Sequence, residues 1–88
     1  MYSYTAERSF VLTDEGQRSF LRVRDFAAKC LKNSGAVTTG VLMGVASAGD
    51  SFKSMACVDR LLELGEVSEV SSPNYAWQDR IFINRTLI

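Results

Sequence analysis

The chain has 88 residues, a length typical of one small domain, and 47% of them are hydrophobic, which is enough to build a core. Ten Lys and Arg residues balance ten Asp and Glu residues, so overall charge does not draw the chain to DNA, RNA or an anionic membrane. The longest apolar run, residues 41–48, is far shorter than the ~20 residues of a membrane span, and the N-terminus does not resemble a signal peptide, so we expect a cytoplasmic protein without a membrane partner.

The N-terminal part predicts a strand followed by a helix. Residues 8–13, RSFVLT, form an aromatic and β-branched run that ends at a polar turn, which indicates an edge strand within an N-terminal extension over residues 1–13. Asp14 and Gln17 have the spacing of a capping box. We therefore expect a helix over residues 15–33, with its N-terminus stabilised by these two side chains.

This first helix has an apolar face and a basic face. At 100° per residue, its apolar side chains gather on a side that predicts contact with the core: Phe20, Val23, Ala27, Cys30 and Leu31. Four cations fall within roughly 80° of each other on the opposite side, with Asp25 the only acid among them: Arg18, Arg22, Lys29 and Lys32. The pattern is typical of a solvated face, but these cations are also candidates for binding a partner.

A second, weaker helix is expected over residues 38–46. Ala36 and Val37 have the character of a short strand, and Thr38 or Thr39 can cap the helix that follows. Gly40 and Gly44 each cost about 1 kcal/mol relative to alanine in a helix interior. This helix is therefore expected to depend on packing of its apolar side chains.

A third helix is predicted over residues 51–64, capped by Asp50 or Ser51, with Gly65 after its end. Its apolar positions, spaced by three and four, predict one core-facing side: Phe52, Met55, Val58 and Leu62. The opposite side, expected to face solvent or a ligand, carries Lys53, Ser54, Cys57 and Arg60. Over residues 66–83, polar and apolar residues first alternate and a polar loop then separates them from a second strand-like run, which predicts a hairpin with a long loop.

The run VDRLLELGEVSEV resembles the end of the recognition helix and the first wing strand in winged helix-turn-helix proteins. The order of the expected elements resembles that family over about residues 15–83. The resemblance implies a single α+β domain of three helices with a small antiparallel sheet. It also implies a small DNA-binding protein, a transcriptional regulator, which inserts its third helix into the major groove of double-stranded DNA.

Site residues follow from this resemblance. The third helix would contact DNA through Ser51, Lys53, Ser54, Cys57 and Arg60. The wing would contact it through Ser72, Asn74, Tyr75 and Arg80. A homodimer would double the number of cations on DNA, although the sequence shows no obvious dimerisation helix.

The alternative hypothesis is a protein-interaction module or inhibitor that keeps the winged-helix scaffold and binds a protein instead of DNA. Tyr75 and Trp77 support it, because large aromatic side chains in a polar loop either fold onto the core or anchor a partner. The basic face of the first helix is a second candidate contact for such a partner. The neutral overall charge favours this alternative.

No enzyme is expected, because the chain has no histidine and neither cysteine has a base beside it in sequence. No glycine pattern indicates a phosphate loop, and no metal site or cofactor is predicted. Cys30 and Cys57 are interpreted as reduced thiols, although a disulfide between two helices would also fit the pattern.

Overall fold

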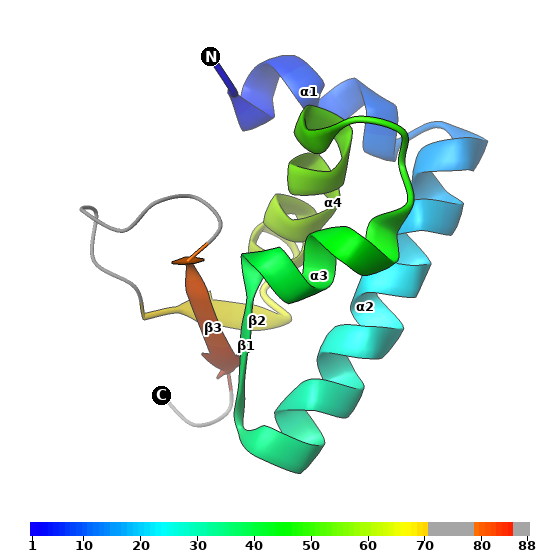
Figure 1. The fold of residues 1–88 in the computed structure, drawn as a ribbon. Coiled ribbons are helices and arrows are strands. Elements are labelled where there is room, and N and C mark those ends of the chain that lie inside the picture. Colours follow the sequence, from blue (N-terminus) through cyan, green and yellow to red (C-terminus); the bar gives the residue numbers. More distant parts are fainter. Residues whose placement is uncertain (71–78, 86–88) are drawn as a thin grey trace.

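The computed structural model describes residues 1–70 and 79–85, and within them four helices and a three-stranded antiparallel sheet (Figure 1). The α+β class is therefore confirmed, with one helix more than expected. The elements, in chain order, are α1 (Tyr4–Val11), α2 (Asp14–Ser34), β1 (Ala36–Thr38), α3 (Thr39–Ala46), α4 (Ser51–Glu63), β2 (Val67–Glu69) and β3 (Ile81–Asn84).

The extra helix is α1, so the strand predicted over residues 8–13 is wrong. Phe10 and Val11 lie in or next to the hydrophobic core, with Val11 fully buried, and α1 packs across α4 (Figure 1). The FVL run has strand propensity, but propensity is a weak preference that tertiary packing overrides. Here the helical conformation buries one side of the segment against α4.

The N-terminus of α2 is capped by Thr13, which corrects the predicted capping box of Asp14 and Gln17. The Thr13 hydroxyl oxygen accepts a hydrogen bond from the Gly16 amide at 3.0 Å, and Asp14 is already inside the helix. The Gln17 side chain donates instead to the Val11 carbonyl at 2.6 Å. The Gln17 bond, together with the bond that the Thr13 hydroxyl donates to the Phe10 carbonyl at 2.7 Å, links the start of α2 to the end of α1 and fixes the corner between the two helices.

The remaining helices lie close to their predicted bounds. α3 follows Thr38, whose side chain makes no capping bond, and the helix buries Thr39, Leu42 and Ala46. α4 is capped by Asp50, which accepts from the Lys53 amide at 2.8 Å. Gly35 and Gly65, the residues predicted to follow helix ends, have φ values of 80° and 74°.

The sheet has the strand order β1-β3-β2, so the strand that is last in sequence lies in the middle. Val37 pairs with Phe82 and Ser68 with Ile83, both antiparallel. The predicted short strand at residues 36–37 and the predicted pairing within residues 66–83 are thus confirmed. Phe82 is fully buried between the sheet and the helices.

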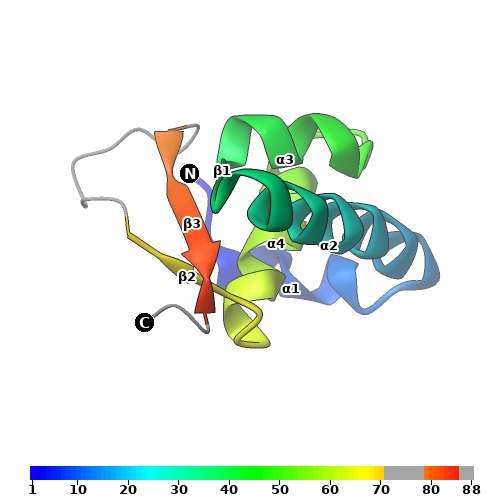
Figure 2. The ribbon, with the colours of Figure 1, turned by 90° about the horizontal axis from the view of Figure 1, so that it is seen from below.

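α4 is the central helix of the fold. Seen from two directions, the sheet lies at one side of the molecule and the other helices surround α4 (Figures 1 and 2). It packs against α1, α2, α3 and β2. Six of its thirteen residues are consequently buried: Ser54, Met55, Ala56, Cys57, Val58 and Leu61.

Candidate interaction surfaces

α1 covers the part of α4 that the resemblance assigns to DNA. The Tyr2 hydroxyl donates to Asp59 Oδ2 at 2.6 Å, and the Tyr4 hydroxyl donates to Glu63 Oε1 at 2.6 Å. Arg8 completes the contact with an ion pair to Glu63 Oε2 at 2.7 Å. These bonds hold the N-terminal segment against the last two turns of α4.

Two of the predicted DNA contacts lie inside the protein. Ser54 is 7% exposed and Cys57 is fully buried, so the prediction that they face solvent is wrong. The periodicity of α4 identified one packed side, but the helix has neighbours on several sides. Phe52 shows the converse error, because it was predicted to lie in the core and is 41% exposed.

The predicted cations of this surface already have partners. Lys53 Nζ lies 5.1 Å from the centre of the Phe10 ring, a cation–π contact, and Arg60 pairs with Glu63 at 2.5 Å. Arg80 is bound more extensively: its guanidinium lies 2.8 Å from an oxygen of Asp59 and 2.8 Å from one of Glu69. A phosphate would have to compete with these contacts.

The rest of the predicted DNA and wing contacts divide into two groups. Ser51 is exposed at the start of α4. Ser72, Asn74, Tyr75 and Trp77 lie outside the described residues. The proposed wing contact surface therefore retains only Arg80 within the described part of the chain.

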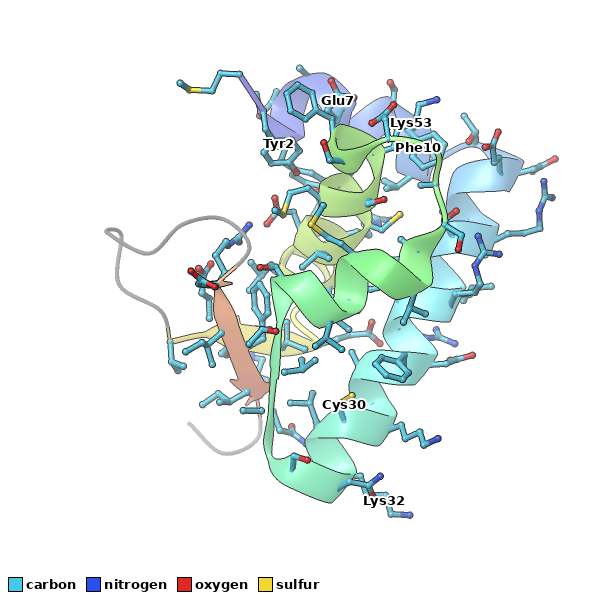
Figure 3. All side chains as sticks on the ribbon, viewed as in Figure 1. Tyr2, Glu7, Phe10, Cys30, Lys32 and Lys53 are labelled. Atoms are coloured by element: carbon cyan, nitrogen blue, oxygen red, sulfur yellow. The ribbon has the colours of Figure 1, made fainter. Side chains whose placement is uncertain are left out.

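The basic face of α2 lies apart from these residues. Arg18, Arg22, Lys29 and Lys32 are all exposed, as the helical pattern predicted. Arg22 also donates from Nη2 to the Ala46 carbonyl at 2.8 Å, at the C-terminal end of α3. Lys32 lies at the far end of α2 from α1, whereas Lys53 lies beside α1 (Figure 3). These two cations therefore lie far from each other.

An apolar groove opens between the N-terminal segment, α3 and α4. Its volume is about 430 Å³, and the described residues that line it are Met1, Tyr2, Met43, Ser51, Phe52 and Met55. The Tyr2 and Phe52 rings meet edge to face with their centroids 5.7 Å apart. All three methionines of the chain line this methionine groove. The sequence did not predict it, because residues 1, 43 and 55 converge only in three dimensions.

Three titratable groups of the α1–α4 contact, Tyr2, Tyr4 and Glu63, are held in their ordinary charge states. Hydrogen bonds from Tyr4 and Arg60, with further help from Arg8, lower the pKa of Glu63 to about 2. Burial, followed by the hydrogen bond to Glu63, raises the pKa of Tyr4 to about 12, and burial with the bond to Asp59 raises the pKa of Tyr2. These three groups therefore do not titrate near neutral pH.

Cys30 and Cys57 are free, in agreement with the reduced thiols expected from the sequence. Burial raises the pKa of the Cys57 thiol to about 11, so it is protonated and shielded at neutral pH. Within residues 1–70 and 79–85, no group of three or more Cys, Asp or Glu side chains is arranged to hold a metal ion.

Over the same described residues, none of the helices has the length and apolar character to cross a membrane. Comparisons of the chain with protein-family models, curated proteins and solved structures gave no match.

Proposed function

We propose that this chain is a protein-interaction domain on a winged-helix-like scaffold, and that the methionine groove receives an apolar segment of a protein partner. The order of α2, β1, α3, α4, β2 and β3 supports the scaffold assignment, since it is the order of a winged helix-turn-helix. Because one scaffold supports many functions, the function depends on the residues at the surface.

The convergence of all three methionines on one groove carries the proposal. Methionine is unbranched and its sulfur is polarisable, so its side chain adapts to differently shaped apolar surfaces. Phe52 adds a half-exposed aromatic ring at the groove, and such rings are frequent anchors in protein interfaces. Met1 is fully exposed, so part of this apolar surface is in contact with water when the partner is absent.

The packing of α1 favours a protein partner over recognition of DNA by α4. Insertion of α4 into a major groove would require α1 to leave, with loss of the three side-chain contacts to Asp59 and Glu63. It would also expose the buried Val11 side chain. A partner that binds the methionine groove requires neither change, because the groove is open in this arrangement.

A selection from a displayed library of random peptides tests the proposal. We expect apolar, helix-forming peptides that bind the native chain and not Phe52→Asp. The matched control is Leu64→Asp, which places the same charge at another exposed apolar position, 49% exposed and outside the groove. A library that yields no Phe52-dependent peptide would contradict the proposal.

The methionines supply an independent readout. With ¹³C in the methyl groups of methionine, NMR shows three signals, and all of them report on the groove. A selected peptide should shift these signals, whereas a duplex DNA should not. A series of protein concentrations without peptide shows whether a second copy of the chain can occupy the groove. Peptide binding without any methionine shift would place the site elsewhere.

A further inference from the structure

Charge is distributed unevenly over this neutral chain. Residues 18–32 of α2 contain five cations and a single carboxylate, Asp25, which is a net charge of +4. Since the whole chain sums to zero, the remaining residues carry a net charge of −4. The part of α2 that follows its acidic first turn, which contains Asp14 and Glu15, therefore holds a concentrated positive charge that the composition conceals.

The cations outside α2 are largely neutralised by neighbouring groups. Arg8 and Arg60 share Glu63, and Arg80 lies between two carboxylates. On α2, the ion pair found among the described residues joins Arg24 to Asp25 at 3.6 Å, between side chains that are 45% and 76% exposed. An exposed pair of this length contributes little.

The basic face consists of the four α2 cations that have no carboxylate within 4 Å among residues 1–70 and 79–85: Arg18, Arg22, Lys29 and Lys32. They are exposed along one side of the helix. At 1.5 Å per residue, the fourteen steps from Arg18 to Lys32 span about 21 Å. That length corresponds to roughly six base pairs of a duplex at 3.4 Å each.

The face also indicates which polyanion fits. Single-stranded nucleic acid is bound by aromatic side chains that stack on its bases, and the exposed positions of α2 include no aromatic residue. Rigidly spaced cations without stacking groups are suited to the regular phosphates of a duplex. Arg22 is held in place by its bond to the Ala46 carbonyl, which fixes one cation of the row.

We propose that the basic face of α2 binds the phosphate backbone of duplex nucleic acid without reading its sequence. This binding surface is separate from the methionine groove and from α4, and it does not depend on the proposed protein-binding function. A chain with both surfaces can hold a protein partner on one side and a duplex on the other.

The number of cations on the basic face predicts how strongly duplex affinity depends on salt concentration. If four cations each neutralise one phosphate of B-DNA, the logarithm of the binding constant falls with the logarithm of salt concentration at a slope of about −3.6. Between 50 and 200 mM salt, affinity should then fall about 150-fold. Two duplexes of unrelated sequence should give the same values.

The test compares two variants of equal net charge. The first replaces Arg18, Lys29 and Lys32 with Gln and leaves Arg22, which bonds to α3; its slope should fall to about −0.9. The control replaces Arg8, Lys53 and Arg85 with Gln, three cations outside α2, and its slope should stay near −3.6. Circular dichroism establishes that both variants are folded.

Several results would overturn the proposal. They are the absence of binding to a mixed-sequence duplex at 50 mM salt, or an equal loss of affinity in the control variant. Displacement of the duplex by polyglutamate at the same concentration of charge would assign the face to an acidic protein instead. Because none of these measurements involves the methionine groove, failure here leaves the peptide selection unaffected.

Discussion

Replacing Gly16 with alanine should strongly destabilise the protein. Gly16 lies in the first turn of α2, where the helix passes against the end of α1. A Cβ atom at this position would lie 1.8 Å from the Phe10 carbonyl oxygen and 2.7 Å from the Val11 Cα atom. These neighbours are backbone atoms, so no side chain can rotate to make room.

The expected cost follows from that geometry. In an unconstrained helix, alanine is better than glycine by about 1 kcal/mol. Here the Cβ contacts are far shorter than the roughly 3.5 Å of ordinary van der Waals contact, and the corner between α1 and α2 has to open. Overpacking in a well-packed region typically costs about 1–3 kcal/mol, and we expect at least about 3 kcal/mol for a clash with fixed backbone.

Gly44→Ala is the matched control. A Cβ atom there has nothing within 4 Å, so the same chemical change should stabilise α3 by about 0.5–1 kcal/mol. Urea unfolding followed by circular dichroism measures the free energy of unfolding of both variants. For a domain of this size, a change of 1 kcal/mol in this free energy corresponds to about 4–8 °C in Tm. A Gly16→Ala protein as stable as the native chain would refute the close packing of α1 on α2.

Three further predictions concern charge and thiol chemistry. Stability should fall as pH drops from about 4.5 towards 2, because the pKa of Glu63 is lowered to about 2 in the folded state and its favourable contacts are complete only above its ordinary pKa. Glu63→Gln should flatten that part of the pH profile, and an unchanged profile would contradict the α1–α4 contact. At pH 8, Cys57 should react with iodoacetamide at least about 100-fold more slowly than a free thiol, because its pKa is raised to about 11. Cys30, which is only partly buried, should react first, and equal rates would contradict the burial of Cys57. Arg80→Ala should cost about 2 kcal/mol in urea unfolding, because it removes the cation shared by the half-buried Asp59 and the exposed Glu69, and a neutral result would show that this pairing does not stabilise the fold.

Local signals in the sequence predicted most of the elements correctly. The helix now seen as α2 ends at Gly35, and Asp50 caps α4, because these features depend on side chains within a few residues of each other. The N-terminal helix was missed for the opposite reason. Its conformation depends on α4, which is more than 40 residues away in sequence.

The candidate sites were predicted less well, because a periodic pattern shows that a helix has an apolar side and not how many neighbours it has. Cys57 was predicted to face solvent and is buried, and Phe52 was predicted to lie in the core and is exposed, because α4 is the central helix. The basic face of α2 was predicted correctly, since α2 has one packed side and one solvent side. The methionine groove had no sequence signal, as its residues come from three separate segments.

The sheet has a consequence for how this protein folds. Among the strands of residues 1–70 and 79–85, β3 lies between β1 and β2 and pairs with both. Val37 pairs with Phe82, which lies 45 positions later in the chain. The entropy lost in closing this long loop therefore opposes the pairing of β1 with β3. The helices can therefore assemble first, while the edges of β1 and β2 that β3 will pair with remain unpaired. During synthesis from the N-terminus, any extended segment that reaches these strand edges before β3 competes with β3 for the same backbone hydrogen bonds.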